Sequence, residues 1–196
     1  MKYTPKSFSI PELKGISKTT IDEHIKLYEG YINHLNLILE NISSLKEDPT
    51  EAYARSEMQR RLSFEFDGMR NHEYYFLSLE KGSAPLSDGD LKKMIEDQWG
   101  SVGIWLSHFK ILAKTRGIGW AMLSYDPENK SLINSWVDEQ HLGHLTGLSP
   151  IIALDMWEHS FVADYLPSGK GKYIDDFFEN LNWSVIEENF SKAVGK

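Results

Sequence analysis

One stretch of the chain reads Pro150-Ile151-Ile152-Ala153-Leu154-Asp155-Met156-Trp157-Glu158-His159 and joins a continuous apolar run to two polar side chains. The run 151–154 predicts a strand that is buried on both faces. Asp155 follows at once, and a carboxylate beside an apolar strand end is costly unless a cation or several donors satisfy it. If the chain turns directly into a helix, His159 can converge with Asp155 on one point. The stretch therefore predicts a buried strand that ends in a polar site.

The segments around this stretch predict a small antiparallel sheet flanked by helices. Residues 120–125 and 131–137 are short β-prone runs joined by the turn-like Asp126-Pro127-Glu128-Asn129, which predicts a hairpin. Residues 91–112 have a helical period, and two amphipathic helices complete the chain after the apolar run.

The N-terminal half predicts two long helices. Apolar side chains alternate at steps of four and three from residue 21 to residue 42, the stripe of an amphipathic helix, and Ser17 and Thr19 are candidate N-caps. The segment 46–50 interrupts this pattern, and a second helical period then runs from residue 62 to residue 79. Two long helices with a short connection usually form an antiparallel hairpin.

Together these elements predict an α+β fold, in which an N-terminal antiparallel helical hairpin precedes a C-terminal α/β unit with a small antiparallel sheet flanked by helices. The cluster Gly82-Ser83-Ala84-Pro85 lies between two periodic segments and marks the boundary. We expect a first unit over residues 1–85, with an irregular arm over residues 1–16, and a second unit over residues 86–196.

Composition narrows the functions that this chain can have. Its 196 residues include no cysteine, which excludes thiol catalysis, iron-sulfur clusters and cysteine-based zinc sites. The net charge of -8 argues against nucleic acid as a partner, because duplex binding needs clustered Lys and Arg. No apolar run approaches the roughly 20 residues that span a bilayer, and no signal-peptide pattern follows the start. We therefore expect a cytoplasmic protein without a membrane partner.

Two of the seven histidines point inward from the predicted helices. His24 and His72 each lie three or four residues from apolar side chains along their helices. A lone inward histidine is most often a buried neutral imidazole that one hydrogen bond satisfies. Two of them on facing helices, with Asp155 and His159, make a set of three histidines and one aspartate. Such a set suits manganese or iron better than magnesium or calcium.

The segment Asp155-Met156-Trp157-Glu158-His159 resembles the Asp-x-Trp-Glu-His signature of iron/manganese superoxide dismutases. Asn71-His72, which precedes an aromatic-rich segment, is similar to the second ligand helix of that family. Gly117-Ile118-Gly119-Trp120 resembles its Gly-Ser-Gly-Trp strand start, and Asn182-Trp183 its C-terminal Asn-Trp. The resemblance covers nearly the whole chain from about Ser17 onward, in the order of the family.

The resemblance implies a metal centre and a reaction. The implied ligands are His24, His72, Asp155 and His159, with a solvent molecule as the fifth. One manganese or iron ion per subunit would alternate between its divalent and trivalent states. It would convert two superoxide anions and two protons into dioxygen and hydrogen peroxide, and no organic cofactor would be needed.

The resemblance also implies roles for residues around the metal. Gln140 corresponds to a family position whose side chain hydrogen-bonds the metal-bound solvent, and it slightly favours manganese. His141 competes for this role. Tyr31 resembles the tyrosine at the substrate entrance of the family, and Trp120 and Trp157 resemble its aromatic wall around the metal.

Two further implications concern assembly and substrate. Glu158 resembles the glutamate that reaches across the dimer interface of the family to the neighbour's ligand histidine, so we expect a homodimer with reciprocal pairs of Glu158 and His159. Superoxide is an anion and the chain is acidic, so local cations must assist the encounter. Lys170, Lys172 and Lys26 are the candidates.

Two departures from the family pattern change what we expect of the first helix and of the interface. Seven residues separate His24 from Tyr31 where the family commonly has eight, so the first helix is expected to lack a one-residue π-bulge found in relatives. Ser160-Phe161-Val162 replaces the common Ala-Tyr-Tyr, so the cross-interface Tyr–His hydrogen bond of the family cannot form in its usual way.

Two other hypotheses make different predictions. A di-iron carboxylate protein would carry Glu three residues before its histidine ligands, and neither His24 nor His72 has one there. A metal-free or inactive relative that acts as a helical interaction protein would keep its inward histidines for structure alone and would bind no metal.

Overall fold

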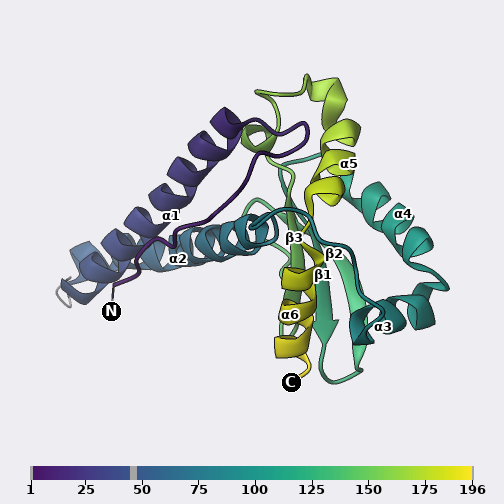
Figure 1. Cartoon of the computed structure of the whole chain (residues 1–196). Helices are drawn as coiled ribbons and strands as arrows, with labels where there is room; N and C mark the ends of the chain where they lie inside the picture. The colour runs from purple at the N-terminus through teal and green to yellow at the C-terminus, as the bar shows by residue number, and fades with distance from the viewer. Residues whose placement is uncertain (1, 45–47, 196) are drawn as a thin grey trace.

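The structure is a computed structural model, and it describes residues 2–44 and 48–195. A long helical hairpin projects from a second part, which is built on a three-stranded sheet with helices around it (Figure 1). This arrangement confirms the predicted α+β fold. The division into units 1–85 and 86–196 stays a prediction.

The hairpin consists of α1 (Lys18–Ser44) and α2 (Pro49–Leu77), which pack along each other. Both helices begin at side-chain caps. Ser17 Oγ accepts the Thr20 N–H at 3.1 Å, and Asp48 accepts the Thr50 N–H at 2.7 Å. Of the break predicted over residues 46–50, residues 46 and 47 lie outside the described residues.

The buried stripe of α1 follows the predicted apolar period. Its buried members are Thr20, Ile21, His24, Tyr28, Ile32 and Leu35. The helix is α-helical throughout, so it has no π-bulge, as the shortened spacing from His24 to Tyr31 predicts.

Residues 2–16 form the predicted irregular arm, which runs along the hairpin toward α5 (Lys170–Asn180) (Figure 1). Side-chain amides satisfy its backbone at both ends. Asn36 accepts the Tyr3 N–H at 2.8 Å and donates to the Tyr3 carbonyl at 2.9 Å. Asn180 does the same with Lys14, with both hydrogen bonds at 2.9 Å. The arm is therefore held without belonging to a sheet.

The sheet has β1 (Gly119–Asp126) in its centre, with β2 (Ser131–Asp138) on one side and β3 (Ser149–Asp155) on the other. Both neighbours are antiparallel to β1, so the predicted hairpin is β1–β2. Residues 151–154 are all buried, and because successive strand residues face opposite sides, β3 is covered on both faces as predicted. The helices α2 and α6 (Trp183–Ala193) contact β3.

The helix predicted over residues 91–112 is wrong in one respect, because it is two helices. α3 (Asp90–Trp99) ends at Gly100, which adopts φ 83°, and α4 (Val102–Ala113) begins at Ser101, whose Oγ accepts the Ile104 N–H at 3.2 Å. A glycine in the left-handed region ends a helix without steric cost, and a serine caps the next one. Both helices pack against β2.

The predicted C-terminal helices are α5 and α6, and two short 3-10 turns precede them. These turns are η1 (Glu158–Ser160) and η2 (Pro167–Gly169). The chain thus turns immediately after β3, as the convergence of Asp155 and His159 requires.

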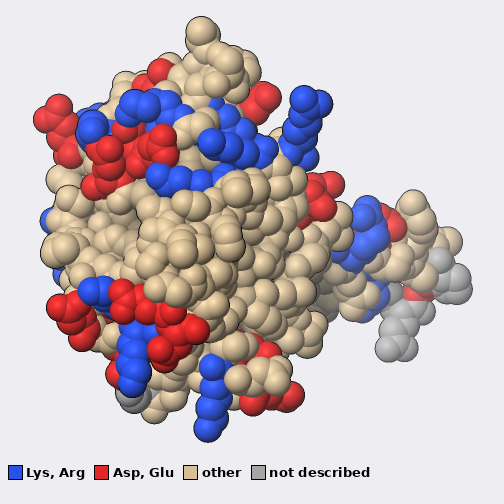
Figure 2. Space-filling view, turned by 90° about the vertical axis from the view of Figure 1, so that its right-hand side faces the viewer, with Lys and Arg blue, Asp and Glu red and all other residues tan. Residues whose placement is uncertain are grey.

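The surface mixes both signs of charge. On the face shown in Figure 2, Lys and Arg side chains lie beside Asp and Glu side chains, with a broad uncharged area between the charged groups. Several charged side chains of the described residues form ion pairs, such as Lys110 with Asp175 at 2.6 Å. Among the helices of the described residues, none combines the length and the apolarity that crossing a membrane requires.

Two leucines of α1 provide a test of the hairpin core. Leu35 is fully buried, whereas Leu37 is 56% exposed. We expect Leu35→Ala to lower the free energy of unfolding by about 2–5 kcal/mol, because it leaves a cavity in the core. Leu37→Ala should change it by less than about 0.5 kcal/mol. Denaturant titration measures both, and equal losses would contradict the packing described here.

Candidate metal centre

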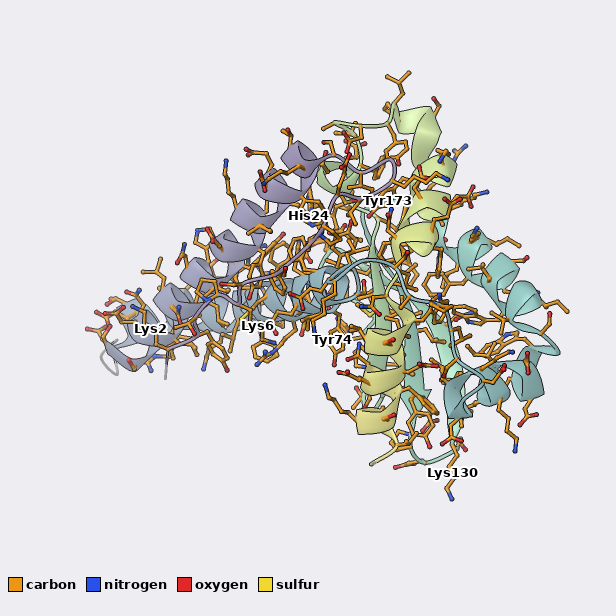
Figure 3. All side chains as sticks on the ribbon, in the orientation of Figure 1. Lys2, Lys6, His24, Tyr74, Lys130 and Tyr173 are labelled. Atoms are coloured by element: carbon orange, nitrogen blue, oxygen red, sulfur yellow. The ribbon has the colours of Figure 1, made fainter. Side chains whose placement is uncertain are left out.

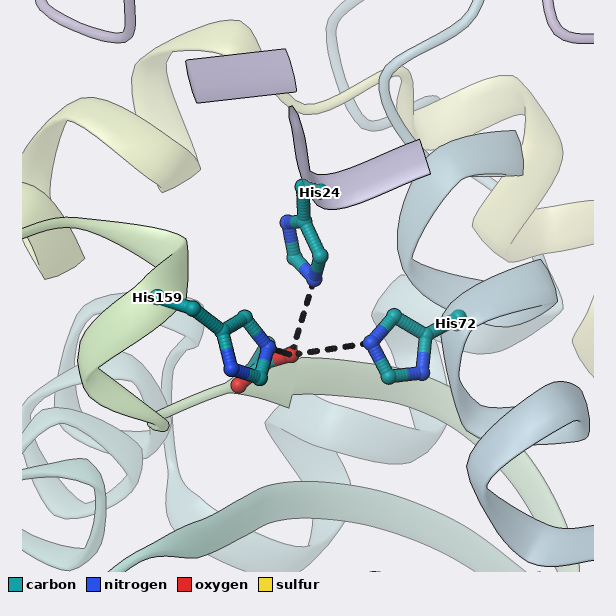
Figure 4. Close-up of side chains that lie close together, drawn as sticks. His24, His72 and His159 are labelled. Atoms are coloured by element: carbon teal, nitrogen blue, oxygen red, sulfur yellow. Dashed lines mark hydrogen bonds and ion pairs between the residues drawn. The ribbon is translucent and has the colours of Figure 1, made fainter. Parts of the chain in front are cut away.

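Four side chains from four elements converge where the hairpin meets the sheet (Figure 4). They are His24 on α1, His72 on α2, Asp155 at the end of β3 and His159 in η1. One potential ligand atom from each lies within 4.8 Å of the others. The side chains of the first three are fully buried, and that of His159 is 22% exposed. The structure thus brings together all four residues that the sequence singled out as ligands.

The three imidazoles point at a single carboxylate oxygen, Asp155 Oδ2. The Nε2 atoms of His24, His159 and His72 lie 3.0, 3.2 and 3.5 Å from it (Figure 4). Donors that bind one ion at about 2.1 Å lie roughly 3.0–3.6 Å apart at angles of about 90–120°. The three distances from Asp155 Oδ2 therefore fall in the range for donors that share one ion, and three nitrogens with one carboxylate suit iron or manganese.

The orientation of His72 supports this fit. Its Nδ1–H donates to the Gly68 carbonyl at 2.6 Å, which leaves Nε2 without a proton in the neutral ring. Nε2 is buried and has no hydrogen-bond partner among the described residues, although it faces the Asp155 carboxylate. A nitrogen lone pair directed at a carboxylate oxygen is repulsive unless a cation lies near both. A structural histidine satisfied by one hydrogen bond would not need this arrangement.

The protonation states suit metal binding. Burial lowers the pKa of His24, and burial together with the nearby His24 lowers the pKa of His72 to about 3. Burial by itself raises the pKa of Asp155, but the interactions with His159 and then His24 outweigh it and hold that pKa well below its usual range. Neutral imidazoles and an ionised carboxylate are the forms that bind metals.

The Asp155 residue is anchored on all sides. Its Oδ1 accepts the Trp157 N–H at 2.7 Å. Its carbonyl accepts the Ser160 hydroxyl at 3.1 Å and the Tyr173 hydroxyl at 2.9 Å. Figure 3 shows Tyr173 on α5, beside the end of the hairpin that carries His24. The sequence did not indicate that Tyr173 would bond Asp155. Its position in the apolar period of α5 predicts only a core residue.

A hydrogen-bonded chain surrounds His72. Gln140 is fully buried, and its Oε1 accepts the Trp120 Nε1–H at 2.9 Å. Its Nε2–H donates to the Tyr31 hydroxyl, also at 2.9 Å. The rings of Tyr31 and Trp120 each lie 5.0 Å from the His72 ring. The side chains of Gln140, Tyr31 and Trp120 therefore lie together beside His72.

The remaining residues of the sequence prediction lie around the edge of the cluster. Trp157 stacks on His159 with ring centroids 5.8 Å apart, and Glu158 is exposed at the start of η1. His141 lies against Phe64 at 5.6 Å instead of against the four clustered residues, and its buried Nδ1 has no partner among the described residues.

The three lysines expected to guide substrate are engaged away from the cluster. Lys26 donates to Glu23 at 2.6 Å, Lys170 donates to the Thr115 carbonyl at 2.7 Å, and Lys172 pairs with Asp176. Their side chains thus interact with groups outside the four residues of the cluster.

The chain is similar to known proteins over nearly its full length. Residues 87–189 match the family described as iron/manganese superoxide dismutases, C-terminal domain. The chain is 33% identical over 186 residues to an iron superoxide dismutase of Cupriavidus metallidurans, covering 93% of this chain and 92% of that protein. It is 34% identical over 200 residues to an iron superoxide dismutase of Aquifex aeolicus, covering 98% and 93%. It is 33% identical over 171 residues to a manganese superoxide dismutase of Haloarcula marismortui, covering 87% and 83%.

The relatives named for iron and those named for manganese are about equally similar to the chain. The overall sequence identity therefore does not distinguish iron from manganese as the metal. The matched domain covers more than half of the chain, and these relatives align with nearly all of it. The chain therefore belongs to the iron/manganese superoxide dismutase family.

Proposed function

We propose that this chain dismutes superoxide at one iron or manganese ion held by His24, His72, Asp155 and His159. In the reaction, two superoxide anions and two protons give one dioxygen and one hydrogen peroxide. The observation that supports the site most directly is the convergence of three imidazole Nε2 atoms on Asp155 Oδ2, at 3.0, 3.2 and 3.5 Å. Iron or manganese, when bound there, supplies the one-electron oxidation and reduction that the reaction needs.

The chain orients two of the four residues, His72 and Asp155, through backbone groups. The Gly68 carbonyl holds the His72 ring through Nδ1, so that Nε2 faces the ion. The Trp157 N–H holds one oxygen of Asp155 and leaves the other for the metal. Because these partners belong to the backbone, they keep the ligand geometry rigid.

The Tyr31 hydroxyl keeps a proton that it can donate. Its oxygen accepts the Gln140 Nε2–H, so its own hydroxyl hydrogen remains available for another acceptor. Burial raises the pKa of Tyr31, so the hydroxyl keeps its proton at neutral pH. We propose that Gln140 and Tyr31 act together on the metal-bound solvent and on proton supply, and that Gln140 slightly favours manganese over iron.

The first test removes a ligand. His72→Ala should lose both bound metal and dismutase activity, because no other described donor replaces its Nε2. His108→Ala is the matched control, since His108 is exposed on α4. Purified proteins are reconstituted separately with manganese and with iron, and superoxide consumption and metal content are measured on the same samples.

Two outcomes of this test are decisive. Activity in proportion to bound metal supports the proposal, and the more active metal identifies the cofactor. Activity retained by His72→Ala would remove His72 from the ligand set, and the absence of metal from the native chain under both conditions would favour the metal-free alternative.

The second test separates Gln140 from His141. Gln140→Ala should retain the metal but lower kcat by about 10–100-fold, the usual effect of losing a group that supports a metal centre. His141→Ala should change kcat by less than about twofold, because His141 packs against Phe64 rather than Tyr31. The reverse result would assign the role to His141.

The cytoplasmic location of the protein stays a prediction.

We further propose that the chain forms a homodimer. His159 is the one partly exposed residue of the cluster, and Glu158 beside it is exposed. Three exposed apolar side chains lie in this region, which are Ile118, Leu142 and Val162 at 42%, 51% and 43%. Glu139 bonds both Ile118 and Trp157, and the Val162 N–H donates to the Glu158 carbonyl at 2.8 Å. Ile118 and Val162 therefore lie beside the site. A two-fold interface here would let Glu158 reach the partner's His159.

The dimer proposal is tested by sedimentation equilibrium. The native chain should have about twice its chain mass of 22.6 kDa. Val162→Asp should weaken the association at least tenfold, because it buries an unpaired charge in the interface. Ile111→Asp is the control, since Ile111 is 71% exposed on α4. A native chain that sediments as a monomer contradicts the proposal.

A further inference from the structure

A cation that the sequence did not suggest lies near the metal centre. Superoxide is an anion and the chain has a net charge of -8, so rapid encounter requires local positive charge. The lysines expected for this role are engaged elsewhere. We propose that Arg61 on α2, held in place by the buried Glu65, guides anions toward the metal centre. This inference rests on the proposed function.

Arg61 shares a helix face with the ligand His72. The residues Arg61, Glu65, Gly68 and His72 follow one another at spacings of three or four, so they lie along one face of α2. Eleven residues separate the two ends, which is about 16 Å along a helix axis. Midway, a Cβ atom on Gly68 would lie 2.5 Å from Tyr31 Cδ1, so the glycine leaves the space that the Tyr31 ring occupies.

A series of ring contacts leads from Arg61 to the cluster. The guanidinium carbon of Arg61 lies 3.5 Å from the ring centroid of Phe64. The Phe64 ring is 5.9 Å from Tyr31 and 5.6 Å from His141, and Tyr31 is 5.0 Å from His72. Tyr31 and His141 are both partly exposed, so this is a place where the surroundings of the cluster reach solvent.

In the ion pair of Arg61 and Glu65, the positive group is exposed and the negative group is buried. Arg61 Nε donates to Glu65 Oε1 at 2.9 Å, and the carboxylate side chain is only 5% exposed whereas the arginine side chain is 49% exposed. The negative end is therefore inside and the positive end faces solvent. The hydrogen bond and the stacking on Phe64 hold the guanidinium in one place.

The charge of Arg61 also affects the pKa of Tyr31. Burial raises the pKa of Tyr31, the charges of Asp155 and Glu65 raise it further, and the charge of Arg61 opposes them. Asp67 is another carboxylate on α2, close to His141 and His144. Burial raises its pKa, and the neighbouring His144 and His141 oppose that effect.

Arg70 provides a matched control on the same helix. It also donates to a buried carboxylate, Glu73, at 2.8 Å, and the two side chains are 41% and 6% exposed. Its aromatic neighbours are Tyr3 and Phe66, at 5.8 and 5.5 Å, on the side of the arm. Removing Arg70 therefore changes the net charge equally but leaves the approach past Tyr31 intact.

The experiment compares Arg61→Gln, Arg61→Lys and Arg70→Gln with the native metal-loaded protein. The readout is kcat/KM for superoxide at salt concentrations of about 10 mM and about 0.5 M. One unit charge acting across about 8 Å of water changes the local anion concentration about twofold. We expect Arg61→Gln to be about two- to threefold slower at low salt and equal to the native protein at high salt.

The other two variants are controls, and they show which results would overturn the proposal. Arg61→Lys and Arg70→Gln should both match the native protein at each salt concentration. A defect of Arg61→Gln that does not depend on salt would show a packing role and overturn the inference. An equal salt-dependent loss in Arg70→Gln would show an effect of net charge alone and would overturn it too.

A second readout does not depend on dismutase activity. Azide binding to the metal-loaded proteins, followed by visible absorption, should be about 1.5-fold weaker in Arg61→Gln at low salt, with equal metal content, because the charge acts across about 16 Å. If no protein consumes superoxide, the proposed function fails, but the azide comparison still tests Arg61. Because Arg61→Gln leaves Glu65 buried without its cation, Arg61→Gln/Glu65→Gln is measured as well. Its azide affinity should lie between those of Arg61→Gln and the native protein, and an affinity equal to the native one would contradict the role of Arg61.

Discussion

The convergence of three imidazoles on Asp155 Oδ2 is the interaction on which the rest of the structure depends. A carboxylate that is completely buried needs compensation, and His24 and His159 lie within hydrogen-bond distance of Oδ2. The unprotonated Nε2 of His72 adds no donor, so the carboxylate still needs a cation. The helices α1 and α2, the end of β3 and the turn η1 must all meet for this convergence to occur. The relative placement of the hairpin and the sheet is therefore tied to this buried polar cluster.

The site lies between the two parts of the molecule and belongs to neither alone. The hairpin contributes two histidines, and the sheet part contributes the aspartate and the third histidine. The N-terminal arm closes the opposite side through Phe8, whose ring is 5.0 Å from Phe76, and the Phe76 ring is 4.9 Å from His24. Lys6 of the same arm, visible over the hairpin in Figure 3, pairs with the buried Glu73 at 2.7 Å. Apolar packing and an ion pair together shield the metal centre from that side.

On the side of Tyr31, the site is bounded by hydrogen-bonded and charged side chains instead of by the arm. Gln140 connects Trp120 to Tyr31, so a single amide holds the partly exposed Tyr31. Beyond Tyr31, the face of α2 continues through Phe64 to Arg61. An acidic protein can thus present a positive group to an anion if a buried carboxylate holds that group from within. Net charge is a poor guide to the potential at a site, because the arrangement of a few charges decides it.

Much of this protein follows from local sequence. The run 151–154 with Asp155 and His159, the apolar stripe of α1 and the short turn between β1 and β2 each express a periodicity or a steric rule that acts over a few residues. The break at Gly100 was missed because a single glycine interrupts a helical period without changing it.

What only the tertiary structure decided are the contacts between segments far apart in the chain. Tyr173 reaches the Asp155 carbonyl, Gln140 reaches Tyr31, and the expected lysines turn to other partners. No spacing encodes such contacts, because they depend on how α2, β3 and α5 pack. The types of the ligands are therefore set by local chemistry, whereas their environment is set by the packing of whole elements.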